Sequence, residues 1–89
     1  KMEDTHNRYF VRLKVEDRCG VLAEMTAIFA KYQVSVAQII QKAARDEGSA
    51  EVVVITAKVR EGDFRTAMEE LSGRSSVRKI SSMLRVYGE

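Results

Sequence analysis

The sequence changes from one periodicity to another between residues 9 and 32, and this change limits the folds that the chain can adopt. Over residues 9–15 apolar and polar side chains alternate, which predicts a half-buried strand. Over residues 22–32 the apolar side chains recur at helical spacing, which predicts an amphipathic helix that ends near Gln33. The segment between them contains Gly20. A strand must therefore pass through a tight turn directly into a helix.

The next two segments read as strands that are joined by a hairpin. Residues 34–41 alternate again, with mixed faces, so this strand should touch something on each side. Residues 42–49 form a charged loop in which Gly48 supplies a positive φ. Residues 51–59 contain a run of β-branched side chains, which predicts a strand that is covered on both faces.

The C-terminal part of the sequence predicts one more helix and one more strand. Acidic residues near Asp63 open the helix, and Gly73 follows its last turn. Its apolar side chains are Phe64, Ala67, Met68 and Leu71. The last strand should span residues 77–87, with Ile80, Leu84 and Val86 facing the core.

The predicted element order is βαββαβ, with residues 1–7 as a tail or linker and residues 8–89 as one domain. Right-handed crossovers place both helices on one face of a four-stranded antiparallel sheet. The expected class is therefore α+β, a ferredoxin-like sandwich with strand order 4-1-3-2. The second and fourth strands are its edges.

Composition and charge exclude several classes of function. One cysteine, Cys19, cannot form an internal disulfide or a cysteine-based zinc cluster, and it fits a reducing, cytoplasmic compartment. The net charge is +2, and the basic residues are scattered, which argues against a nucleic-acid or lipid footprint. The apolar runs are too short to span a membrane. We therefore expect neither nucleic acid nor membrane as a partner.

The residues that catalysis would need are missing from the sequence. His6 is the single histidine and falls in the predicted tail, and Cys19 has no histidine near it in sequence. RNA-binding relatives of the predicted fold carry stacking aromatic residues on the central strands, whereas here the third strand has none and Phe10 is alone on its face of the first strand. We expect no catalytic residues, no metal site and no cofactor in this domain.

The turn before the first helix has the composition of a small-molecule site. The first amides of a helix attract an anion, and Asp17 adds a carboxylate that could hold an ammonium group. Together they suit a free amino acid. In the alternative interpretation, Asp17 or Cys19 only caps the helix and Gly20 only makes the turn. We expect Gly20 to lie at the first helical position with negative φ, where a Cβ would obstruct a bound carboxylate.

The same turn carries a resemblance to a known family. The run Asp-Arg-Cys-Gly-Val-Leu at residues 17–22, with the strand before it and the entry to the second strand at Val34-Ser35-Val36, resembles an ACT domain. The likeness covers residues 8–87. Within the family, residues 9–15 are most similar to the C-terminal regulatory domain of homoserine dehydrogenases. Cys19 stands where the family usually has proline.

This resemblance implies a regulatory domain that binds a small amino acid, typically threonine. The attached catalytic domain would be an NAD(P)-dependent homoserine dehydrogenase of the aspartate pathway. Such domains usually pair through the second strand and the first helix, with the effector at the seam. A ligand-free module that serves only dimerisation, with the same fold and edge pairing, remains the alternative.

The resemblance also implies a set of effector-binding residues. Asp17 would bind the ammonium group of the effector, and the amides of Gly20 and Val21 would bind its carboxylate. Ser35 and Val36 of a partner copy would close the site. The remaining members of the expected set are Cys19 and Leu22 in the turn and, as a weaker candidate, Gln38.

Overall fold

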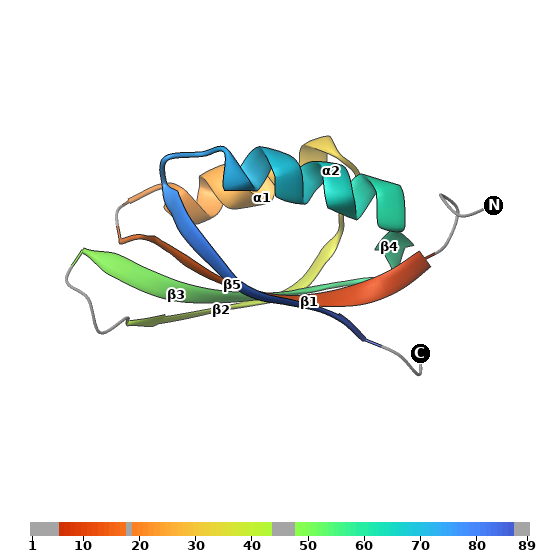
Figure 1. Ribbon diagram of the computed structural model, residues 1–89, viewed down its shortest axis with the longest axis horizontal. Helices are drawn as coiled ribbons and strands as arrows, with labels where there is room; N and C mark the ends of the chain where they lie inside the picture. Colours follow the sequence, from red (N-terminus) through yellow and green to blue (C-terminus); the bar gives the residue numbers. More distant parts are fainter. Residues whose placement is uncertain (1–5, 18, 44–47, 87–89) are drawn as a thin grey trace.

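An antiparallel sheet with two helices on one face is the architecture of the computed structural model, which describes residues 6–17, 19–43 and 48–86 (Figure 1). This arrangement confirms the predicted ferredoxin-like α+β class. The elements are β1 (His6–Glu16), α1 (Val21–Lys31), β2 (Val36–Ala43), β3 (Ser49–Thr56), β4 (Val59–Arg60), α2 (Glu61–Ser72) and β5 (Val77–Val86).

The sheet is built around β1. This strand pairs with β3 on one side and with β5 on the other, and β2 pairs with β3. The order β2-β3-β1-β5 is the predicted order 4-1-3-2. The two-residue strand β4 was not predicted, because a pair of residues has no periodicity, and it pairs with His6 and Asn7 of β1. Residues 6 and 7, which the sequence placed in the tail, therefore belong to the sheet.

Several other boundaries differ by a few residues from the expectation. The strand β2 continues to Ala43, into the predicted hairpin loop, and β3 ends at Thr56. Gly48 has the expected positive φ, at 77°. The other loop residues, 44–47, and the predicted strand end at residue 87 lie outside the described residues, as do residues 1–5 and residue 18.

The core lies between the sheet and the two helices. Alternation puts Val11, Leu13 and Val15 of β1 on the helix side, and all three are fully buried. The helices contribute Phe29 from α1 and Leu71 from α2, which are also fully buried. In α1 the buried stripe begins at Val21, and Leu22 is only partly buried, since the helix starts one residue earlier than predicted.

The C-terminal half of β5 corrects one prediction. Leu84 and Val86 were expected to face the core, yet Leu84 is 58% exposed and pairs with Phe10 on the face away from the helices. Irregularities in the β1–β5 register, between Arg12 and Leu13 and between Lys14 and Val15, interrupt the alternation of β5. Ile80 and Met83 therefore share the helix side although they are three positions apart, a spacing that regular alternation would place on opposite faces. Leu84 and Val86 share the open side.

A polar cluster on Glu70 holds α1 against α2. The Tyr32 hydroxyl and the Lys31 ammonium group both donate hydrogen bonds to Glu70 Oε1, and Arg74 donates to Oε2. The pKa of Glu70 is lowered below the usual carboxyl value. The hydrogen bond from Tyr32 makes the largest contribution, and the one from Lys31 makes the next largest. Conversely, Glu70 raises the pKa of Lys31. The ionised form of Glu70 is therefore favoured in the folded state.

A pH-dependent contribution to stability follows from this cluster. Because the folded-state pKa is lowered, the contribution of Glu70 is present above the unfolded pKa, which is about 4.3, and is lost as the pH falls through the folded value. We expect Glu70→Gln to destabilise the domain at neutral pH and to reduce the loss of stability in acid. Urea unfolding at about pH 7 and pH 3 checks this. The exposed neighbour Glu69 provides the control, because Glu69→Gln should behave as wild type at both values.

Candidate functional site

The described residues of the turn between β1 and α1 are exposed, and none of them caps α1 with its side chain. Gly20 is the N-cap residue of α1 and its carbonyl accepts the first helical hydrogen bond, from the Glu24 amide at 2.9 Å. Neither Asp17 nor Cys19 caps the helix, and both are exposed. No described side chain therefore caps the first amides of α1. In the same turn, the Asp17 carboxylate faces water.

Gly20 does not have the conformation that the sequence suggested. Its φ is 89° and its ψ is −7°, in the left-handed region, whereas a negative φ was expected. The helix begins at Val21, so Gly20 is the residue through which the chain enters it. Apart from its two chain neighbours, no described residue has an atom within 4 Å of a Cβ built on Gly20. Glycine is therefore needed here because residues with a Cβ rarely adopt this φ, and the space beside Gly20 is open.

Gly20→Ala is expected to lower the free energy of unfolding by about 1 kcal/mol, because alanine is strained at this φ. Gly62→Ala is the matched control. Gly62 lies in the first turn of α2 without a positive φ, and a Cβ there meets no described atom within 4 Å outside its own turn of helix, so alanine should be neutral or stabilising. Chemical denaturation of both variants checks the pair, and equal stability of Gly20→Ala and wild type would contradict the assignment.

Backbone hydrogen bonds fix the turn to the neighbouring loops. The Asp17 amide donates to the Gly48 carbonyl at 2.9 Å, and the Glu16 amide donates to the Ser76 carbonyl at 2.8 Å. These bonds use the main chain, so the Asp17 carboxylate is not needed to hold the turn. The side chain of Val21 is buried in the core, and Leu22 packs against it. Those two residues can offer a ligand mainly their amides.

The other predicted effector residues lie at the far end of α1. This helix has 11 residues and is about 16 Å long, so within one chain it separates Gly20 from Ser35. Ser35 and Val36 line a hollow of about 410 Å³ that Thr26, Ala30, Gln33 and Val34 complete. Gln38 is exposed on β2 and does not line it. One chain therefore presents the two halves of the predicted site at opposite ends of one helix.

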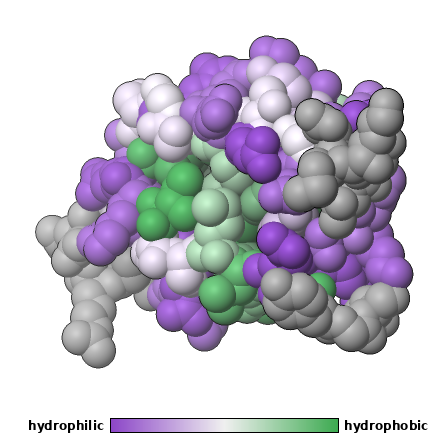
Figure 2. All heavy atoms as spheres, turned by 45° about the vertical axis from the view of Figure 1, so that its right-hand side comes forward, coloured by the Kyte–Doolittle hydropathy of each residue, from purple (hydrophilic) through white to green (hydrophobic). Residues whose placement is uncertain are grey.

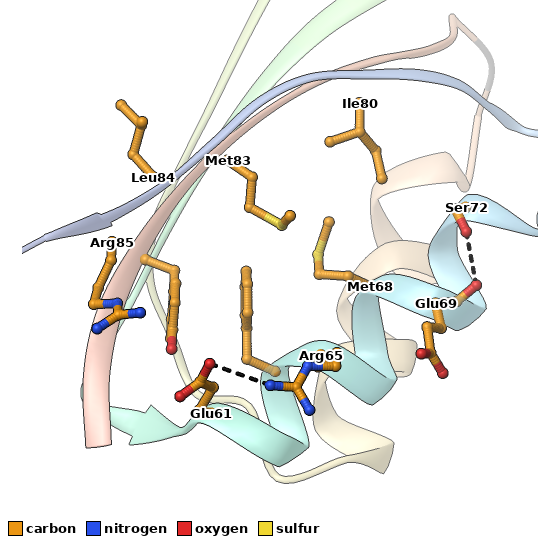
Figure 3. A pocket seen from close by; sticks show the side chains of 11 residues that line it. Glu61, Arg65, Met68, Glu69, Ser72, Ile80, Met83, Leu84 and Arg85 are labelled. Atoms are coloured by element: carbon orange, nitrogen blue, oxygen red, sulfur yellow. Dashed lines mark hydrogen bonds and ion pairs between the residues drawn. The ribbon is translucent and has the colours of Figure 1, made fainter. Parts of the chain in front are cut away.

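A second hollow, which the sequence did not indicate, lies between α2 and β5. In Figure 2 apolar side chains gather at the centre of the face shown, bordered by hydrophilic ones, and Figure 3 shows the hollow from close by. Its volume is about 460 Å³, and the side chains of Met68, Ile80 and Met83 point into it. The Tyr9 and Phe64 rings, stacked with 3.9 Å between their centroids, also line it. The lining comes from β1, α2 and β5, which are far apart in sequence. No local motif could have indicated it.

Residues 6–17, 19–43 and 48–86 contain no group of three or more histidine, cysteine or acidic side chains that could hold a metal ion. Among the same residues, neither helix is long and apolar enough to cross a membrane.

The fold and the glycine turn define a class of small α+β domains, and comparison with known proteins identifies the family. The sequence profile of the ACT domain matches residues 9–74, so the chain belongs to the ACT domain family. Homoserine dehydrogenase from Synechocystis is 39% identical over 85 residues, covering 96% of this chain. Homoserine dehydrogenase from Corynebacterium glutamicum is 34% identical over 83 residues, covering 93% of this chain. The predicted likeness to homoserine dehydrogenases is thus confirmed.

Solved structures agree with this fold. A homoserine dehydrogenase from Thiobacillus denitrificans superposes with a TM-score of 0.81 at 24% identity, over 94% of this chain and 18% of that one. The ACT domain of a GTP pyrophosphokinase from Chlorobium tepidum superposes with a TM-score of 0.66 at 18% identity, over 92% of this chain and 100% of that one. The chain spans 19% of the Synechocystis relative and 18% of the Corynebacterium relative.

Proposed function

We propose that this domain binds a small amino acid, with threonine as the leading candidate, and thereby regulates an attached homoserine dehydrogenase. The observation that carries the proposal is the turn at residues 17–22. It combines an exposed carboxylate, a helix N-terminus without a side-chain cap, and open space at Gly20. The Asp17 carboxylate suits the ammonium group of an amino acid, and the amides of Gly20 and Val21 suit its carboxylate.

A complete site on this proposal needs two copies of the domain. The hollow at Ser35 and Val36 lies at one end of α1 and the Gly20 turn at the other. If α1 and the edge strand β2 of two copies pair side by side in antiparallel fashion, each Gly20 turn meets the Ser35 end of its partner. The edge position of β2 supports such pairing, because no other described strand pairs with its outer side.

Two measurements on the isolated domain test this proposal. Threonine should raise its melting temperature, because a ligand that binds only the folded state stabilises it. Sedimentation at micromolar concentration should give a mass of twice 10.1 kDa. A dimer that responds to no free amino acid would favour the alternative, a ligand-free dimerisation module. A monomer without a response would contradict both.

The dehydrogenase chemistry on this proposal belongs to the rest of the polypeptide. The named relatives are about five times as long as this chain, and NAD(P) would bind in their remaining part. This domain would supply no catalytic group and no cofactor site. Its role would be to change the rate of the attached enzyme when the effector binds.

A further inference from the structure

The sheet has one face that no element of the described chain covers. The two helices lie on the opposite face (Figure 1). On the open face an apolar strip crosses the strands, and it contains two of the exposed large hydrophobic side chains, Leu84 at 58% and Ile40 at 38%. Register places Phe10 beside Leu84, and the largely buried Val53 beside the exposed Ile40. Ile55 pairs with Phe10 and so continues the strip from β1 onto β3.

The side chains around this strip are mainly basic. Register places them on the open face together with Phe10 and Leu84. The basic residues of this face are Arg8, Arg12, Lys14, Lys42 and Lys79, and the acidic ones are Glu16 and Glu51. Glu51 and Arg12 form an ion pair at 2.9 Å and offset each other, and basic residues outnumber acidic ones among the others. The open face therefore combines an apolar centre with a predominantly positive border.

We propose that the open face docks the domain onto the catalytic part of its own enzyme, against a surface with an apolar centre and an acidic border. This inference rests on the proposed attachment to a homoserine dehydrogenase. About four-fifths of the named relatives lies outside the region that this chain matches, so a large partner surface belongs to the same polypeptide. Opposite charge at the border would orient the contact, and the apolar strip would supply its hydrophobic burial.

Two other occupants fit this face less well. A second copy would bring the same basic border against itself, and like charges in close contact are unfavourable. A nucleic acid would match the charge, but stacking on bases needs exposed aromatic rings, and Phe10 is the one aromatic residue of this face among those described. The strip is otherwise aliphatic, which suits the apolar side chains of a protein.

A neighbouring pair of residues on β5 gives a matched test. Leu84 and Met83 are adjacent and similarly exposed, at 58% and 52%. Both residues border the hollow beside α2, but Figure 3 shows that the Met83 side chain points into it, whereas the Leu84 side chain points away from it. Aspartate at either position adds the same charge at little cost to folding, because both side chains are largely in water. Leu84→Asp would place that charge at the docking face, and Met83→Asp would place it on the other side.

The experiment uses the full-length enzyme with a protease site in the segment that joins the domain to the catalytic part. After cleavage, the wild-type domain should stay bound at about 0.1 M salt and be released when the salt is raised to about 1 M. Leu84→Asp should weaken the association at least tenfold, whereas Met83→Asp should change it by less than twofold. Lys79→Glu should weaken it and reduce its dependence on salt.

Separation of the wild-type pieces at low salt would overturn the docking, as would equal association in Leu84→Asp and Met83→Asp. If the cleaved pieces stay together but threonine does not change the rate of the enzyme, the result would support the docking and contradict the proposed amino-acid regulation. The two proposals can therefore fail separately.

Discussion

Phe29→Ala is expected to lower the free energy of unfolding by about 3–5 kcal/mol, the range for large-to-small substitutions in a core. Phe29 has no exposed surface and lies on the face of α1 that packs against the sheet. Its removal would leave a cavity that the surrounding strands cannot close. The total stability of a domain of this size is about 5–15 kcal/mol, so the variant should be close to unfolding.

Urea denaturation followed by far-UV circular dichroism measures this loss. Leu84→Ala is the control, because Leu84 is 58% exposed and its truncation should change stability by less than about 0.5 kcal/mol. If Phe29→Ala lost no more than the control, the helix face described above would not be the core of the protein.

Asp17→Ala is expected to abolish the stabilisation by threonine. At a hundredfold excess over Kd, a ligand bound by the folded state alone stabilises it by about 2.7 kcal/mol, and this whole increment should disappear. Without ligand the variant should melt close to wild type, because the Asp17 side chain is exposed and its amide makes the bond to Gly48.

The measurement is the melting temperature with and without threonine. Asp63→Ala serves as the control, since Asp63 lies in the first turn of α2 and should leave the threonine response intact. A large drop in the melting temperature of Asp17→Ala without ligand would instead assign Asp17 a structural role. An unchanged threonine response would remove it from the site.

The order of the elements could be predicted because it depends on local periodicity. The alternation around Val11 and the helical stripe through Met25 and Phe29 are properties of short segments, and both appear as expected in the structure. The positive φ of Gly20 and the reversed face of Leu84 could not be predicted in this way. They depend on where a helix is entered and on an irregular register with a distant strand.

Part of the candidate site could likewise be predicted from local sequence, and part of it could not. Residues 17–22 are adjacent in sequence, so their grouping in one turn could be predicted from the order of strand, glycine and helix. Their separation from Ser35 by the length of α1 needed the structure. The hollow beside Met68 and Met83 also needed it, since three distant elements meet there.

The position of β1 has a consequence for motion. This strand is hydrogen-bonded to β3 and to β5 along most of its length, so its amides should open to exchange only when the whole domain unfolds. The edges of β2 and β5 should open at much lower free energy. The Gly20 turn follows directly on β1 and is tied by the Asp17 amide to the loop before β3. An effector that binds at Asp17 would meet a backbone that is already held by the sheet and by this bond, and little of its binding energy would go into positioning that residue.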